Sequence, residues 1–202
     1  MEIKKILLAT NNPGKIEEMR AILSRPDLCL VTPAELDIKL NVSEDGSTYA
    51  ENATLKALAF AKTSGLTSLA DDSGLEVDLL DGQPGLNSHR FAPWPEATDA
   101  DRRKYLLEKL KGKPRPWWAC FHATVVLATP DGRVGVANGE CRGEIIPQER
   151  GWHGFGYDSI FFIPAFGRTM AELEMHEKNG ISHRACAIRN AEAIISEMMG
   201  IH

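Results

Sequence analysis

The stretch LADDSGLEV, from Leu69 to Val77, places two adjacent carboxylates between two apolar runs. We expect Leu66–Ala70 and Leu75–Leu80 to form strands, with the acids in the connection between them. On an extended chain neighbouring side chains point to opposite sides, so Asp71 and Asp72 need not do the same job. Two carboxylates also suit a divalent cation, because Mg²⁺ commonly binds one or two of them together with phosphate oxygens. The alternative is a β-turn in which the acids cap the chain.

Strands and helices alternate along the rest of the sequence, which predicts an α/β protein around a mixed β-sheet. Thr48 with Glu51, and Thr169 with Glu172, have the spacing of capping boxes at helix starts. The predicted strands are 4–9, 28–32, 119–128, 133–140, 144–146 and 159–163, of which 119–128 and 133–140 form a hairpin. The predicted helices are 16–23, 48–62, one after Thr98, a short one after Thr169 and a final one after Ser182.

Length and charge limit the function classes. A chain of 202 residues with 43% hydrophobic and 25% charged residues suits a single domain over residues 1–202, arranged in two lobes. The net charge of −5 and the pI of about 5.7 argue against a nucleic-acid partner.

Cysteine spacing and apolar runs indicate the compartment. The four cysteines are far apart and form no C-x-x-C pair, which favours reduced thiols over disulfides or a cysteine-based zinc site. The apolar run in MEIKKILLAT is too short for the core of a signal peptide, and the sequence has no apolar segment long enough to span a bilayer. We therefore expect a soluble, cytoplasmic protein without a membrane partner.

The stretch LLATNNPGKIEEM, residues 7–19, reads as a strand, a polar turn and the start of a helix. Free backbone N–H groups and the positive end of the helix dipole favour a phosphate in such a turn, and Lys15 adds a full charge. It differs from a Walker loop, since Ile16 stands where a magnesium-binding Ser or Thr would follow the lysine. An ordinary turn with a surface lysine is the alternative.

The stretch WHGFGYDSIFFIP, residues 152–164, alternates glycines with aromatic residues. This pattern predicts that Phe155 and Tyr157 expose their rings ahead of a strand, where a flat base could stack. Asp158 could accept a hydrogen bond from a sugar hydroxyl, a backbone amide or a basic side chain. The alternative is that these aromatic residues pack the entry of the strand.

The stretch HEKNGISHRACAIR, residues 176–189, gathers Lys178, His183 and Arg184 around a glycine turn and a helix start, which favours an anion. A basic surface cluster is the alternative.

Glu44 and Asp45 are further candidate metal ligands, or members of a solvated loop. Together these motifs supply the cationic, acidic and aromatic groups that would bind a Mg²⁺-bound nucleoside polyphosphate. No G-x-S-x-G elbow and no cysteine beside a base occurs, so attack by an activated water is favoured over a covalent intermediate.

Five stretches, ATNNPGK, AENATLKA, ADDSGLEVD, GFGYDSIF and EKNGISHR, occur in this order between residues 9 and 184. In this set the chain resembles the inosine triphosphate pyrophosphatase family, also called Ham1-like. The resemblance implies a long mixed β-sheet flanked by helices, two lobes with a substrate cleft between them, and a homodimer. It also implies Mg²⁺-dependent hydrolysis of dITP, ITP and XTP at the α-phosphorus to the nucleoside monophosphate and pyrophosphate, which removes deaminated purines from the nucleotide pool.

The resemblance also implies roles for single residues. Asp72 is the proton acceptor and, with Glu44, a metal ligand, and Asp71 is a further candidate ligand. Residues implied to bind the substrate are Thr10, Asn11, Asn12, Pro13, Gly14 and Lys15 in the phosphate turn, Lys56 and Ser73, Phe155, Gly156, Tyr157 and Asp158 around base and sugar, and Lys178, His183 and Arg184. The segment GLNSHRFAPWPEA departs from the family pattern at His89 and at Pro93–Pro95.

Base chemistry agrees with this specificity. Hypoxanthine and xanthine present an oxygen acceptor at position 6, whereas adenine presents an amino donor. Donors such as Arg184, His183 or a helix-start N–H would be left unpaired by adenine, at roughly 1 to 3 kcal/mol each. Two rivals are a Maf-like phosphohydrolase for modified pyrimidines or methylated bases, and a nucleotide sensor that binds without turnover.

Overall fold

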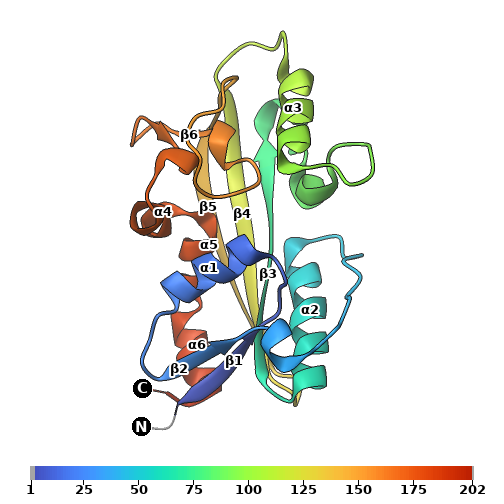
Figure 1. Ribbon diagram of the computed structural model, residues 1–202, viewed down its shortest axis with the longest axis vertical. Helices are drawn as coiled ribbons and strands as arrows, with labels where there is room; N and C mark the ends of the chain where they lie inside the picture. Colours follow the sequence, from blue (N-terminus) through green and yellow to red (C-terminus); the bar gives the residue numbers. More distant parts are fainter. Residues whose placement is uncertain (1–2, 202) are drawn as a thin grey trace. The chain divides into compact units, whose positions relative to one another are not determined.

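A computed structural model of the chain describes residues 3–201. Seven strands form one sheet in the order β2-β1-β3-β4-β5-β6-β7. Figure 1 shows its long strands β3, β4 and β5 side by side. β1 pairs in parallel with β2 and β3, whereas β6 pairs antiparallel with β5 and β7, so the sheet is mixed as predicted. The strands are β1 (Lys4–Leu8), β2 (Leu28–Val31), β3 (Thr67–Val77), β4 (Trp117–Ala128), β5 (Val134–Ile145), β6 (Phe161–Ile163) and β7 (Arg168–Thr169).

Helices flank this sheet, which confirms the predicted α/β class. Within residues 3–201 no helix has the length and apolar character needed to cross a membrane. The α-helices are α1 (Pro13–Ile22), α2 (Tyr49–Ser64), α3 (Asp99–Leu110), α4 (Met175–Ile181), α5 (His183–Asn190) and α6 (Glu192–Met199). Short 3₁₀ turns are η1 (Ala34–Leu36), η2 (Asp78–Leu80), η3 (Gly85–Arg90), η4 (Asp158–Ile160) and η5 (Met170–Glu172).

The chain divides into two compact units. Unit 1 comprises the chain up to Asp72, Ala123–Gly139 and the chain from His183 onward, and unit 2 comprises Ser73–His122 and Glu140–Ser182. Strands β3, β4 and β5 contribute residues to both units. The candidate site residues fall into both units.

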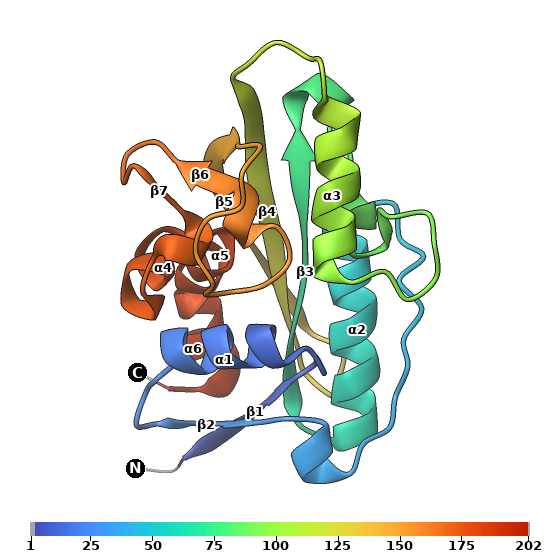
Figure 2. The same cartoon turned by 45° about the horizontal axis from the view of Figure 1, so that its top comes forward.

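Unit 1 has helices on both faces of its strands (Figure 2). Ile6, Leu8 and Leu69 belong to a core that includes α1, α5 and α6, whereas the alternate residues Leu7 and Ala70 belong to a second core with α2. This alternation follows from the two-residue period of a strand. Polar side chains in this part of β3 follow the same rule. Those at odd-numbered positions, like Leu69, face α1 and α5, and those at even-numbered positions, like Ala70, face α2.

Unit 2 has one core, in which Leu75 and Val77 of β3 pack with Leu106 and Leu110 of α3. The predicted cap of α3 is present, since Thr98 and Asp101 form a reciprocal capping box. Thr169 and Glu172 form the other expected box, at η5. In unit 1, Thr48 Oγ1 caps α2 by accepting from the Glu51 backbone N–H, whereas the Glu51 carboxylate accepts from the backbone N–H and the hydroxyl of Ser47.

The prediction of two strands flanking DDSG is wrong, and so is the β-turn alternative. β3 runs without interruption from Thr67 to Val77. The polar residues lie inside the strand because both of its faces are covered and neighbouring strands continue its hydrogen bonding, so tertiary context overrides turn propensity.

Smaller boundary differences have local causes. Helix α1 begins at Pro13, because proline is pre-organised for a first helical position and Asn12 caps it. The segment 144–146 continues β5 up to Ile145 and forms no separate strand, and Gly180 lies within α4 where a glycine turn was expected. The final helix is two helices, separated at Ala191.

Gly139 provides a test of the packing of β5 against α5. A Cβ atom at this position would lie 2.2 Å from the Ala187 nitrogen and 2.3 Å from the His183 carbonyl oxygen. Since backbone atoms must move to make room, we expect Gly139→Ala to lower the free energy of unfolding by about 1–3 kcal/mol, measured by urea denaturation. The control is Gly180→Ala in α4, where nothing lies within 4 Å, and helix propensity predicts a neutral or stabilising effect. Equal effects of the two substitutions would contradict this packing.

Candidate active site

The two acids of β3 point to opposite faces of the strand, as their alternation predicts. The carboxylate of Asp71 accepts hydrogen bonds from Arg184 of α5, and that of Asp72 accepts from Asn52 of α2. Their repulsion is therefore reduced by separation, and each acid has its own set of partners.

Asp71 is the centre of a buried ion-pair network in unit 1. The Nε and Nη2 atoms of Arg184 donate to Asp71 Oδ2 at 3.1 and 3.0 Å, and Nη1 donates to Glu18 of α1. Arg184 is 1% exposed, Asp71 1% and Glu18 3%. Lys15 completes the network, with Nζ 3.1 Å from Asp71 Oδ1. The network ties β3, α1 and α5 together.

The charges within this network shift the pKa values of Asp71 and Lys15. Burial acts to raise the pKa of Asp71, but Lys15 and Arg184 outweigh it and hold that pKa well below its usual range. Burial lowers the pKa of Lys15, and Arg184 and Lys56 add to the lowering while Asp71 opposes it. Asp71 is therefore an anion that neutralises neighbouring cations. Its candidate role as a metal ligand stays a prediction.

Asp72 lies in a different environment, facing α2. Asn52 Nδ2 donates to Asp72 Oδ2 at 3.0 Å, which fixes the direction of the carboxylate. Burial raises the pKa of Asp72 against the lowering effects of Lys56 and Asn52, and the charge of Glu44 contributes to the rise. A buried carboxylate with a raised pKa is a better proton acceptor than an ordinary surface acid.

Lys56 connects the two acids and Glu44. Its Nζ donates to the backbone oxygen of Asp71 at 2.6 Å and lies 2.9 Å from Glu44 Oε1. Asn52 and Lys56 are four residues apart on α2, so one face of that helix supplies both contacts. The structure thus brings Glu44, Lys56 and Asp72 together as predicted.

The oxygen donors of this group fit a hard divalent cation. Carboxylates are the ligands that Mg²⁺ prefers, usually one or two together with substrate oxygens. Glu44 is half-exposed, Asp72 is buried, and their mutual repulsion contributes to the raised pKa of Asp72. A cation held by both carboxylates would relieve that repulsion.

The polar turn before α1 is ordered by its own side chains. The Asn12 backbone N–H donates to Thr10 Oγ1 at 3.2 Å, and Asn12 Oδ1 accepts from the Lys15 backbone N–H at 3.1 Å. Asn11 and Pro13 are exposed, and Gly14 is half-buried. The Lys15 side chain leaves this turn toward Asp71, so the turn and the strand acids belong to one polar region of unit 1.

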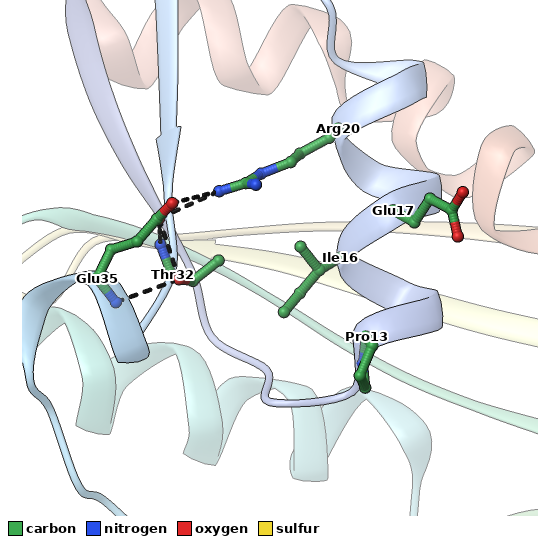
Figure 3. Close-up of a pocket in the computed structure, with 6 residues that line it drawn as sticks. All are labelled: Pro13, Ile16, Glu17, Arg20, Thr32 and Glu35. Atoms are coloured by element: carbon green, nitrogen blue, oxygen red, sulfur yellow. Dashed lines mark hydrogen bonds and ion pairs between the residues drawn. The ribbon is translucent and has the colours of Figure 1, made fainter.

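A hollow of about 450 Å³ lies beside α1. Figure 3 shows six residues that line it. It is lined by Ile16 and Glu17 of α1 and bounded by the exposed ion pair of Arg20 with Glu35. Among the predicted site residues it contacts Pro13 alone. The hollow is therefore separate from the ion-pair network.

In unit 2 the loop Gly154–Asp158 is built around one carboxylate. Asp158 Oδ2 accepts from the Phe155 backbone N–H at 2.9 Å and from Lys178 Nζ at 2.7 Å. These are two of the three donor types expected for Asp158. A Cβ at Gly154, whose φ is +76°, would lie 2.1 Å from Asp158 Oδ2, so the loop requires glycine there.

The two aromatic residues of this loop differ in exposure. Tyr157 is 4% exposed, and its hydroxyl donates to the Ser88 carbonyl oxygen at 2.9 Å. The expectation that Tyr157 exposes its ring is wrong, because the ring completes the core of unit 2 beside Leu75. Phe155 remains partly exposed, and Lys178 Nζ lies 5.3 Å from its ring centroid. Phe155 is thus the ring of this loop that can offer a face to a ligand.

Helix α3 anchors the loop from outside. The Gly156 backbone N–H donates to Asp99 Oδ2 at 2.7 Å, and Arg103 Nη1 donates to the Gly156 oxygen at 2.8 Å. Both backbone polar groups of Gly156 are therefore held by side chains of α3.

Two further predicted substrate-binding residues, His183 and Ser73, lie outside the contacts described above. His183 is the first residue of α5 and is 6% exposed. Ser73 follows Asp72 in β3 and is half-buried. The donors of Arg184 are directed to carboxylates, so the geometry supports positioning of Asp71, and its contact with a substrate stays a prediction.

Sequence reasoning missed four residues of these networks, namely Glu18, Asn52, Asp99 and Arg103. Glu18 follows Lys15 by three residues, so both lie on one face of α1, and Asn52 precedes Lys56 by four. Helical spacing could have identified both. Asp99 and Arg103 carried no local signal, because their contacts span more than 50 residues.

Comparison with known proteins identifies the family. The sequence model of the Ham1 family matches residues 6–194. The chain belongs to the Ham1 family. This membership accounts for the order of the five motifs along the chain and confirms the resemblance.

Named relatives of this Ham1 chain agree with one another. It is 44% identical to a dITP/XTP pyrophosphatase of Desulforamulus reducens over 195 residues, covering 96% of each chain. It is 45% identical to a dITP/XTP pyrophosphatase of Thermus thermophilus over 188 residues, covering 92% of this chain and 88% of the relative. A solved HAM1 protein from Coxiella burnetii superposes with a TM-score of 0.86 at 38% identity, covering 96% of this chain and all of that one.

The buried ion-pair network predicts an asymmetry between two arginines. Arg184→Met removes the guanidinium partner of buried Glu18 and leaves Asp71 with Lys15, so we expect a loss of about 3–5 kcal/mol in the free energy of unfolding. The control is Arg20→Met, which breaks an exposed pair with Glu35 and should cost about 1 kcal/mol or less. Urea denaturation of both variants measures the difference. Similar losses would show that the network contributes no special stability.

Proposed function

We propose that the chain hydrolyses the non-canonical purine nucleoside triphosphates dITP, ITP and XTP to the nucleoside monophosphate and pyrophosphate. The observation that carries the proposal is Asp72, a buried carboxylate with a raised pKa that Asn52 orients beside Lys56 and Glu44. Relatives in the same family bear the name dITP/XTP pyrophosphatase at 44% and 45% identity. The triphosphates dITP and XTP in that name are polyanions, which suits the lysines and the candidate metal ligands of this chain.

Asp72 acts in this proposal as the proton acceptor. A water oxygen attacks the α-phosphorus, the bond from the α-phosphorus to the oxygen bridging it to the β-phosphorus breaks, and pyrophosphate leaves. Asp72 takes the proton from the attacking water. Asn52 keeps Oδ2 in a fixed direction, so the carboxylate need not reorient during the step.

Lys15 and Lys56 bind the triphosphate in this proposal. Both ammonium groups already lie beside β3, at Asp71 Oδ1 and at the Asp71 backbone oxygen. Asp71 neutralises part of the charge that Arg184 and Lys15 bring into the interior, and so keeps Lys15 in place without substrate. The turn from Thr10 to Gly14 supplies backbone N–H groups at the start of α1.

Glu44 and Asp72 hold Mg²⁺ in this proposal. Bound there, the cation would neutralise phosphate charge and polarise the α-phosphate for attack. The fit of the two oxygen donors supports this assignment.

The loop of unit 2 contacts base and sugar in this proposal. The partly exposed ring of Phe155 offers a stacking face, and Lys178 and Asp158 supply a donor and an acceptor. Gly156, Tyr157, Ser73 and His183 complete the proposed contacts, Tyr157 through its backbone because its ring is buried. We further propose a cytoplasmic homodimer that acts on free nucleotides.

A panel of triphosphates with product analysis tests the proposal. We expect ITP, dITP and XTP to yield monophosphate and pyrophosphate much faster than ATP, GTP, dTTP or 7-methyl-GTP. Preference for the last two would favour a Maf-like activity, and tight ITP binding without turnover would favour a nucleotide sensor. Release of the nucleoside diphosphate and orthophosphate would place the attack at the γ-phosphorus.

Asp72→Asn separates chemistry from binding. The amide keeps the shape and the contact with Asn52 but cannot take a proton, so kcat for ITP should fall by about 10² or more while nucleotide binding persists. The matched control is Asp37→Asn on an exposed turn, with an unchanged kcat. Steady-state kinetics and equilibrium dialysis with ITP measure the two effects. A near-normal kcat in Asp72→Asn would reject the role.

Lys15→Ala tests phosphate binding. Removing the ammonium group should raise the KM for ITP by about tenfold or more, in line with the loss of one charge-assisted contact. The control is Lys62→Ala on the exposed side of α2, where no change is expected. An unchanged KM in Lys15→Ala would remove this lysine from the phosphate site.

A further inference from the structure

A second group of metal-ligating side chains lies in unit 2, on the sheet face opposite the core. Leu75, Val77 and Phe121 point into that core, so the alternate residues Glu76, Cys120 and His122 face the other side. Glu140 of β5 joins them. Three neighbouring strands, β3, β4 and β5, thus present sulfur, imidazole and carboxylate groups side by side.

The donor atoms are close to one another. The Cys120 sulfur, one His122 ring nitrogen and one Glu140 carboxylate oxygen all lie within 4.8 Å of each other. Around a tetrahedral zinc with bonds of about 2.0–2.3 Å, donor atoms are roughly 3.5 Å apart. A closure of about 1 Å would therefore suffice, and side-chain rotation can supply it, since the Glu140 side chain is 54% exposed.

Glu76 and Glu140 approach opposite nitrogens of the imidazole. His122 Nδ1 lies 3.5 Å from Glu140 Oε1, and His122 Nε2 lies 3.3 Å from Glu76 Oε2. A histidine that binds a metal through one nitrogen commonly donates the other N–H to a carboxylate, which fixes the tautomer. This arrangement assigns different tasks to the two glutamates.

We propose that Cys120, His122 through Nδ1, and Glu140 bind a divalent transition metal of the zinc class, with Glu76 orienting His122 through Nε2. Sulfur and imidazole ligands select such a metal over Mg²⁺. The donor set differs in this respect from the all-oxygen pair Glu44 and Asp72. Three protein ligands leave a fourth position for water, as in open zinc sites.

Two carboxylates bring negative charge to both sides of His122 in this cluster, with Glu76 Oε2 3.3 Å from Nε2 and Glu140 Oε1 3.5 Å from Nδ1. This arrangement favours a cation. Metal binding displaces the thiol proton and offsets the repulsion among sulfur and carboxylates.

Sequence patterns do not indicate this group, because its members come from three strands and form no C-x-x-C pair. The metal would cross-link β4 and β5 within unit 2, and Glu76 of β3 would contact the metal-bound histidine. Since it would bind the folded chain and not the separated strands, added zinc should raise the midpoint of thermal unfolding.

The test uses the full chain, stripped with a chelator, and titrates it with Zn²⁺ by calorimetry and with Co²⁺ by absorbance. We expect one equivalent of Zn²⁺ at the cluster and a thiolate-to-cobalt charge-transfer band. Cys120→Ser should abolish the band, whereas the control Cys29→Ser, on β2, should keep it. Asp72→Asn should also keep the band, which separates this site from the proposed nucleotide site.

Two glutamate variants resolve the assigned tasks. Glu140→Gln should weaken Zn²⁺ binding by about 100-fold or more, and its exposed position preserves folding if Cys120→Ser does not fold. Glu76→Gln should weaken binding by about 10–100-fold while the charge-transfer band persists, as expected for a residue that orients a ligand. The proposal fails if the stripped chain shows no thiolate band with Co²⁺, if Cys120→Ser retains the band, or if Glu140→Gln binds Zn²⁺ like the unchanged chain.

Discussion

The contact of Arg184 with Asp71 and Glu18 is the constraint on which the rest of unit 1 depends. A guanidinium group with 1% exposure is tolerable only when carboxylates surround it, and here they come from β3 and α1. The same Asp71 holds Lys15 at the end of the polar turn. The interior charge thus sets the distance between α1, α5 and the strand before any ligand is present.

Alternation along β3 divides two chemically identical side chains between two tasks. Asp71 faces cations and stays ionised, so it serves as a fixed counter-charge. Asp72 faces α2, where burial raises its pKa and an amide fixes its direction. The environments of two neighbouring acids pull their pKa values apart, which is the usual physical origin of distinct roles for like groups.

Local signals predicted much of this arrangement, and non-local contacts account for the rest. Periodicity and capping placed α2, α3 and most strands, and the two-residue period predicted the opposite directions of Asp71 and Asp72. Propensity failed at Ser73, inside DDSG, because a covered strand overrides turn formers. Spacing could not reveal that the ring of Tyr157 is buried, since that depends on Ser88, 69 residues away. The same limit hid the anchoring of Gly156 by Asp99.

The uninterrupted course of β3 has a consequence for how the chain can diverge. Insertion or deletion of one residue between Thr67 and Leu69 would reverse the facing of every later side chain in the strand. An insertion would bring Asp71 to the position beside Asn52, and a deletion would bring Asp72 to the position beside Arg184. In either case an acid would face the partners of its neighbour. Length changes in this family member are therefore far better accommodated in its loops than in this strand.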